Sequence, residues 1–173
     1  MRRFVVIGLG KFGSQVARTL FARGHEVVGI DSDPQRVQDL RDHLTRPVTT
    51  DSTEPENLRA LDLAGADAAV VSLGERMDAS ILVTLYLKEL GLQKIVVKAV
   101  SEDHGKILSL IGATAVVRQA RLHPAKYPWI AKLLAKKPAK LVAIAVANKT
   151  ARIAWAIMSK GGTYRPPALA AAA

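Results

Sequence analysis

The sequence has no cysteine and no hydrophobic run long enough to cross a membrane. Without cysteine, neither a disulfide framework nor a thiolate metal site can form, and the four histidines are scattered along the chain. The apolar run 141–147 lies between Lys140 and Lys149 and is much shorter than the roughly 20 residues that a membrane span requires. These absences predict a soluble, cytoplasmic protein with no direct membrane insertion.

Acidic residues are absent from the last part of the chain, where no Asp or Glu follows Asp103. Residues 1–117 hold 14 Lys and Arg against all 15 Asp and Glu, whereas residues 118–173 hold 11 Lys and Arg and no acid. The net charge of +10 therefore belongs to the tail and does not predict nucleic-acid binding by the first part. This contrast predicts a domain over residues 1–118 and a basic helical extension over residues 119–173.

The beginning of the chain carries the strongest local pattern. The apolar residues 4–7 run directly into a G-x-G-x-x-G loop, and a helical pattern follows over residues 15–21. Gly8 permits a tight turn, Gly10 lets a pyrophosphate approach the backbone, and Gly13 lets the helix pack closely on the strand. Amides at such a helix start face an anion. The pattern predicts a phosphate site formed by Ile7, Gly8, Leu9, Gly10, Lys11, Phe12 and Gly13.

Strand and helix patterns then alternate along the chain. Apolar runs predict further strands over residues 25–31, 46–50, 68–74, 94–100 and 114–117. Between them, helices are expected over residues 34–43, 78–90 and 101–111, with a short helix for which Thr53 and Glu56 have capping-box spacing. Such alternation predicts an α/β fold, a Rossmann-type doubly wound parallel sheet with strand order 3-2-1-4-5-6.

An acidic residue ends the second predicted strand. Asp31 follows Gly13 by 18 residues, close to the roughly 20 that separate a glycine loop from a carboxylate accepting from a ribose diol. The alternative is a surface aspartate that caps the next helix, although Asp33 before Pro34 already offers a good cap. Because a carboxylate repels a 2′-phosphate, Asp31 favours NAD, ADP or ATP over NADP, with Arg36 as the one nearby cation that argues the other way.

An ordered set of motifs runs through residues 1–118: the glycine loop, residues 24–31, the triplet Asp51-Ser52-Thr53, residues 78–91 and residues 97–113. This set resembles the N-terminal regulatory domain of Trk/Ktr-type potassium uptake systems, also called the RCK or KTN domain (TrkA-N type). The resemblance implies a cytoplasmic nucleotide sensor that gates a membrane potassium-translocating subunit. It also implies a homodimer or a higher ring, if the altered C-terminus permits.

Position in this fold assigns roles to residues beyond the glycine loop. Lys11 is expected to add a positive charge near the outer phosphate, the alternative being a solvated lysine on a turn. Lys98 is expected to face the same crevice as the nucleotide, the alternative being a solvated residue flanking its strand. The remaining predicted ligand-binding positions follow the second, third and fourth strands: Asp31, Ser32, Asp51, Ser52, Ser72, Leu73 and Gly74.

Two other readings remain. An NAD-dependent oxidoreductase fragment is disfavoured, because no second domain supplies an oriented acid or base over the nicotinamide.

The tail, from about residue 121 to 173, is similar to the C-terminal end of insertion-sequence transposases with RuvC-like catalytic domains, as seen in residues 127–140, 146–158 and 161–167. This similarity implies a fusion. Its basic helices, expected around residues 127–136 and 139–159, leave nucleic-acid binding open as an alternative. Metal-dependent catalysis is disfavoured, because no carboxylate follows Asp103.

Overall fold

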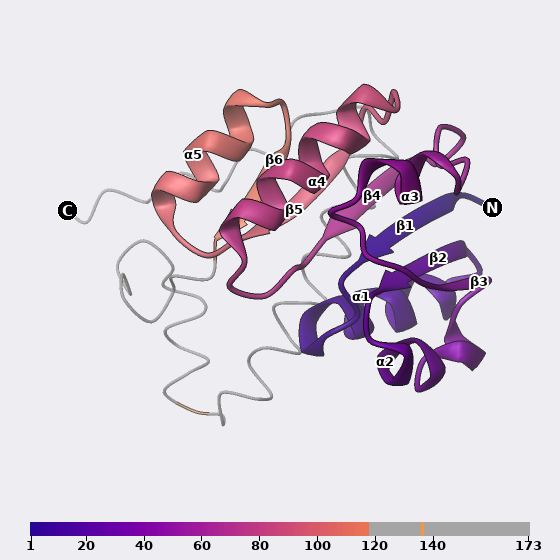
Figure 1. Ribbon diagram of the computed structural model, residues 1–173. Helices are drawn as coiled ribbons and strands as arrows, with labels where there is room; N and C mark the ends of the chain where they lie inside the picture. Colours follow the sequence, from indigo (N-terminus) through magenta and orange to yellow (C-terminus); the bar gives the residue numbers. More distant parts are fainter. Residues whose placement is uncertain (118–135, 137–173) are drawn as a thin grey trace.

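The computed structural model describes residues 1–117 and residue 136, and the expected tail helices lie outside these residues. Strands and helices alternate from the first residues onward (Figure 1). The strands are β1 (Arg3–Ile7), β2 (Glu26–Asp31), β3 (Arg46–Thr49), β4 (Ala68–Val71), β5 (Ile95–Ala99) and β6 (Thr114–Val117). The helices are α1 (Lys11–Phe21), α2 (Pro34–Gln38), α3 (Pro55–Arg59), α4 (Met77–Glu89) and α5 (Glu102–Leu110), with a 3₁₀ turn at Arg41–His43.

All six strands are parallel, and they form one sheet in the order β3-β2-β1-β4-β5-β6. Val5 of β1 pairs with Val28 of β2 on one side and with Ala69 of β4 on the other. The predicted fold and strand order are therefore confirmed. The direction of winding reverses between β1 and β4, which is where open α/β sheets bind their ligands, outside the carboxyl ends of the strands.

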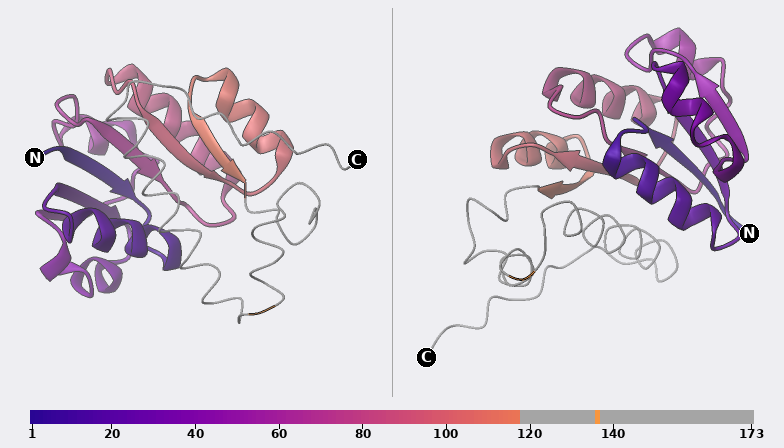
Figure 2. Two further views of the ribbon diagram at one scale, coloured as in Figure 1. Left: turned by 180° about the vertical axis from the view of Figure 1, so that it is seen from behind. Right: turned by 90° about the horizontal axis from the view of Figure 1, so that it is seen from below.

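The core lies on both faces of the sheet. Phe4 and Val6 of β1 pack on the side of α1 and α2, while Val5 and Ile7 pack on the opposite side, with α3, α4 and α5. Figure 2 shows α1 across the sheet from α4 and α5. The four side chains are fully buried. A sheet covered on both faces needs strands that are apolar at every position, which explains the uninterrupted apolar run in β1.

Several predicted boundaries differ from the structure, and the first helix begins at Lys11, four residues before the expected helical pattern. The helix expected over residues 34–43 ends at Gln38, because Thr45 N–H already donates to the Val27 carbonyl and the chain must turn quickly into β3. The fourth strand ends at Val71, three residues earlier than expected. The expected capping box is wrong, because Thr53 donates both its N–H and its hydroxyl to Asp51 Oδ1 and α3 begins later.

Candidate ligand-binding site

The glycine loop, residues 8–13, is held between the ends of β2 and β4. Gly8 N–H donates to the Ile30 carbonyl at 2.8 Å, and Ser72 N–H donates to the Ile7 carbonyl at 2.8 Å. Gly8 has φ +87°, and a Cβ there would lie 2.2 Å from the Ser72 carbonyl oxygen. Both the left-handed conformation and the lack of space require glycine at this position.

Gly13 and Gly10 occupy opposite environments. A Cβ on Gly13 would lie 1.8 Å from the Gly8 carbonyl oxygen, because α1 packs tightly against the loop. A Cβ on Gly10 would meet nothing within 4 Å. Gly10 is also the N-cap of α1, and no side chain accepts a hydrogen bond there from the first amides of the helix. The backbone at Gly10 thus faces open space next to a helix N-terminus, as the approach of a phosphate requires.

Asp31 ends β2 and is buried, with 7% of its surface exposed. Its Oδ2 accepts from Leu9 N–H in the glycine loop at 2.7 Å, and its Oδ1 accepts from Asp33 N–H at 2.9 Å. Asp33 caps α2 by accepting from Gln35 N–H. The alternative of a surface aspartate capping that helix is therefore wrong for Asp31. One buried carboxylate joins the glycine loop to the turn after β2.

Arg36 approaches this carboxylate from solvent. Its Nη1 lies 3.6 Å from Asp31 Oδ2 and its Nε lies 3.3 Å from Asp33 Oδ2, and its side chain is 54% exposed. A ligand ribose that reaches Asp31 therefore also meets a guanidinium group. Sequence reasoning had noted Arg36 as a nearby cation but not that it pairs with both aspartates.

The ends of β3 and β4 supply further polar groups. Asp51 is exposed, and hydrogen bonds from the Thr53 backbone N–H and hydroxyl, together with the positive charge of Arg76, lower the pKa of its carboxyl. Ser52 and Ser72 are buried. The nearness of Arg76 was missed from the sequence. The available signal was its position as a cation in the loop after β4, two residues beyond Gly74.

The predicted site residues do not all gather at one place. The carboxyl edge, meaning the carboxyl ends of β1 to β5, carries most of them where β1 to β4 end: the glycine loop, Asp31, Ser32, Asp51, Ser52, Ser72, Leu73 and Gly74. Lys11 is exposed at the start of α1, and Phe12 packs partly against the core. Lys98 is half-buried in β5, two strands from β1, and strand alternation places it on the face that Val96 shares with α1. The roles of these residues in binding stay predictions.

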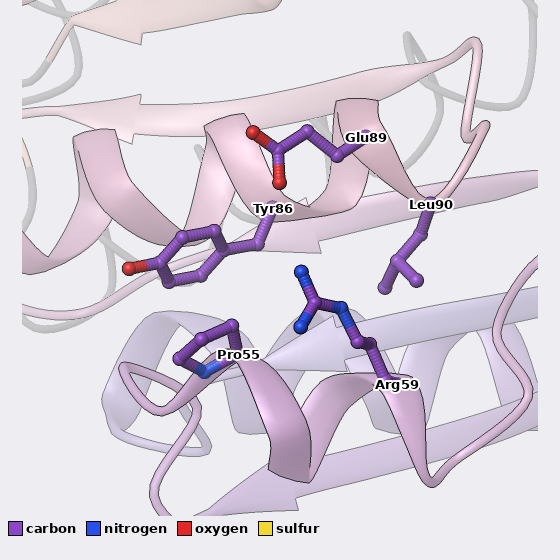
Figure 3. Close-up of a pocket in the computed structure, with 5 residues that line it drawn as sticks. All are labelled: Pro55, Arg59, Tyr86, Glu89 and Leu90. Carbon is purple, nitrogen blue, oxygen red and sulfur yellow. The ribbon is translucent and has the colours of Figure 1, made fainter.

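A separate pocket lies between α3 and α4 (Figure 3). It is lined by Pro55, Arg59, Tyr86, Glu89 and Leu90, none of which belongs to the predicted site. Arg59 is paired with Glu56 within α3. Among residues 1–117 there is no group of three or more His, Asp or Glu side chains that could hold a metal ion. Within the same range, no helix has both the length and the apolar character of a membrane span.

These features define a Rossmann-type domain, in which a glycine loop at the switch point of a parallel sheet lies beside an acidic residue at the end of β2. The sequence matches the TrkA-N domain over residues 4–119, and the chain belongs to this family. The predicted family is thereby confirmed.

Two relatives come from potassium uptake systems of Bacillus subtilis (strain 168). The Ktr system potassium uptake protein C is 42% identical over 120 residues, which cover 69% of this chain and 54% of that protein. The Ktr system potassium uptake protein A is 36% identical over 125 residues, covering 72% of this chain and 54% of that protein. The chain thus spans about half the length of the curated relatives it matches.

Solved structures show the same fold. The NAD(P)-binding domain of an exopolyphosphatase-related protein from Archaeoglobus fulgidus has a TM-score of 0.64 at 23% identity, covering 76% of this chain and 99% of that one. The GsuK channel bound to NAD has a TM-score of 0.58 at 23% identity, covering 73% of this chain and 23% of that one. Because both sequence identities are only 23%, these two structures show a common fold and nothing more.

A different relative confirms the resemblance expected for part of the tail. A probable family 20 transposase of Pseudomonas aeruginosa (strain PAO1) is 47% identical over 62 residues. This match covers 35% of this chain and 18% of that protein. The two parts of the chain thus have relatives of unrelated kinds.

Proposed function

We propose that residues 1–118 form a nucleotide-binding regulatory domain of a potassium uptake system. The observation that carries the proposal is the contrast between the glycines of the loop. Gly8 and Gly13 are fully enclosed, whereas Gly10 faces open space beside the uncapped N-terminus of α1. A chain that needed these glycines for packing alone would have no reason to leave Gly10 open. The link to potassium uptake comes from the two relatives named as Ktr system potassium uptake proteins, which are 42% and 36% identical to this chain over the matched residues.

The ligand class is an adenine nucleotide: NAD(H), ADP or ATP. The residues present fit such a group, since the loop offers backbone amides to its phosphates and Asp31 lies where its ribose would arrive. Each Asp31 oxygen accepts one backbone N–H, and a carboxylate oxygen has room for a second donor. The protein's task is binding without chemistry on the ligand. A structure of GsuK contains NAD and one of a Shewanella denitrificans Kef domain contains AMP, in agreement with this class.

The partner in this proposal is a membrane potassium-translocating subunit, which the domain would gate from the cytoplasm, as a homodimer or a larger ring. The tail over residues 119–173 would be a fused end of a transposase without catalytic function. It would take the place of whatever follows the domain in the relatives. Signal transfer to the membrane subunit would therefore depend on the domain surface.

Calorimetric titration with NADH, ADP and ATP tests the binding step. Wild-type protein is expected to bind at least one of them saturably, and Gly10→Ala is expected to lose binding at least about tenfold while it keeps its fold, because the added methyl group fills only the space of the ligand. Circular dichroism and thermal unfolding provide the control for folding. Absence of saturable binding to all three nucleotides would remove the proposal, and hydride transfer to a substrate would revive the oxidoreductase.

A further inference from the structure

A buried histidine lies next to the carboxyl end of β5, at the part of the carboxyl edge away from the glycine loop. His104, in the first turn of α5, is 1% exposed, and both of its ring nitrogens have partners. Val100 N–H, just after β5, donates to Nδ1 at 3.2 Å, and Nε2 lies 2.7 Å from Ser80 Oγ in α4. Because Nδ1 accepts, the proton of the neutral ring is on Nε2, which donates to Ser80. The Ser80 hydroxyl in turn donates to the Met77 carbonyl at 3.1 Å.

This chain of hydrogen bonds joins two loops. One end is the turn after β5, and the other is the first turn of α4, which ends the loop that begins at Ser72. Ser80 N–H donates to the Arg76 carbonyl, and Arg76 N–H to the Leu73 carbonyl. The same loop encloses Gly8. A continuous set of contacts therefore runs from the imidazole to the glycine loop.

Protonation of the imidazole is incompatible with these contacts. A second ring proton would sit on Nδ1 and face Val100 N–H, so that two donors oppose each other. The new charge would also be buried, and burial is the cause that lowers the pKa of His104. The ring can become charged only if the hydrogen bond to Val100 opens.

The charged groups on the surrounding elements are exposed or half-buried. Near the start of α4 there is Asp78, in β5 there is Lys98, and the first turn of α5 carries Glu102 and Asp103. Asp103 is paired with Lys106 at 2.9 Å. The farther end of α4 holds Lys88 and Glu89, and the strand β6 contains no titratable residue. The imidazole itself is held by hydroxyl and backbone groups.

We propose that His104 is a positioning residue for the ligand site, whose neutral form ties the loops after β4 and β5 together and whose protonation at acidic pH weakens binding of an adenine nucleotide. The inference rests on the proposed function. Its sign follows from linkage: the nucleotide binds the neutral form, so that acid competes with it. Affinity stays level at neutral pH and falls by up to about tenfold per pH unit below the folded-state pKa of the ring.

The first test is a pH titration of the full chain followed by nuclear magnetic resonance, which needs no ligand. The ring is expected in the Nε2–H form at pH 7.5, and the amides of Val100, Ser80 and Gly74 are expected to shift with the titration of His104. If His104 titrates while the amide of Gly74 stays unchanged, the coupling between the histidine and the loop after β4 is refuted, whatever the protein binds.

The second test is calorimetry with ADP at pH 7.5 and 5.5 on wild type and His104→Asn. Asparagine can accept from Val100 N–H but does not titrate. The titration of ADP itself affects both proteins equally, so the larger loss of affinity in wild type reports on His104. His25→Asn is the matched control, because His25 is another histidine with a lowered pKa but precedes β2 at the opposite edge of the sheet. It should keep the wild-type pH dependence.

Ser80→Ala adds a variant that leaves the histidine in place. It removes the acceptor for Nε2–H, and ADP affinity is expected to fall severalfold at pH 7.5 with the fold intact. Equal pH dependence in wild type and His104→Asn would overturn the inference. Failure of wild type to bind any nucleotide at pH 7.5 would instead overturn the proposed function, and the resonance experiment would still decide whether the histidine ties the two loops.

Discussion

The two halves of the carboxyl edge are held by different chemistry. At the ends of β1 and β2, enclosed glycines and the carboxylate of Asp31 hold the backbone directly. At the ends of β4 and β5, the imidazole of His104 accepts from Val100 N–H after β5 and reaches the start of α4 through Ser80. An imidazole gains a positive charge when it is protonated, and burial lowers the pKa at which His104 does so. The second half can therefore respond to acid through His104.

The largest expected effect is steric and falls on the first half. Gly13→Ala places a methyl group 1.8 Å from the Gly8 carbonyl oxygen, and no flexible side chain is there to move away. A loss of at least about 3 kcal/mol in the free energy of unfolding is expected, as for severe overpacking. Urea unfolding followed by circular dichroism measures it. Gly10→Ala is the matched control and should lose less than about 1 kcal/mol.

A smaller effect is expected when the charge of the first half is removed. Asp31→Asn leaves one oxygen to accept from Leu9 or Asp33, and the amide group then opposes the other N–H. About 2 kcal/mol of stability should be lost, the cost of one unsatisfied buried donor. A stability equal to that of wild type would show that the two hydrogen bonds accepted by Asp31 do not stabilise the fold.

At the ends of β4 and β5, the contribution of His104 should be measurable as a pH dependence of the unfolding free energy. The pKa values of His104 and His25 are lowered in the folded protein, mainly by burial. Their stabilising contribution is complete above the unfolded-state pKa of about 6.5 and declines as pH falls below it, because the unfolded chain then binds more protons. Urea midpoints should be lower at pH 5.5 than at 7.5, and less so in His104→Asn. The lowered pKa of Asp51 acts only at more acidic pH.

The smallest effect is expected at the opposite edge of the sheet. Arg3 Nε lies 3.1 Å from Glu26 Oε2, and both side chains are partly exposed to solvent. Glu26→Gln should change the unfolding free energy by less than about 1 kcal/mol, since exposed ion pairs contribute little. A larger loss, measured by the same urea titration, would show that this ion pair at the amino ends of the strands also stabilises the sheet.

Most of the fold was predictable because every strand except β3 carries a run of apolar residues and turn signals separate these runs. Val5 and Ile7 face one way and Phe4 and Val6 the other, yet both sets are apolar, which is typical of a parallel sheet. The ends of elements were less predictable. Thr53 has the spacing of a helix cap, but its backbone N–H and its hydroxyl both donate to Asp51, two residues earlier.

The site was predictable in its residues but not in their contacts. Spacing located Asp31 and the glycines, because the fold demands them at fixed positions. That Asp31 accepts from Leu9 N–H depends on how β2 and the loop meet in space, 22 positions apart. The link between His104 and Ser80, 24 positions apart, arises only because α4 and α5 pack side by side.

The double use of Asp31 restricts how this domain can evolve. The residue expected to recognise the ribose also holds the loop that would bind the phosphates. A change of nucleotide preference, for example toward a ligand with a 2′-phosphate, would ordinarily begin by replacing this carboxylate. Here the first such substitution would weaken the loop before any new ligand was gained. Altered specificity would therefore need a second substitution that restores an acceptor for Leu9 N–H.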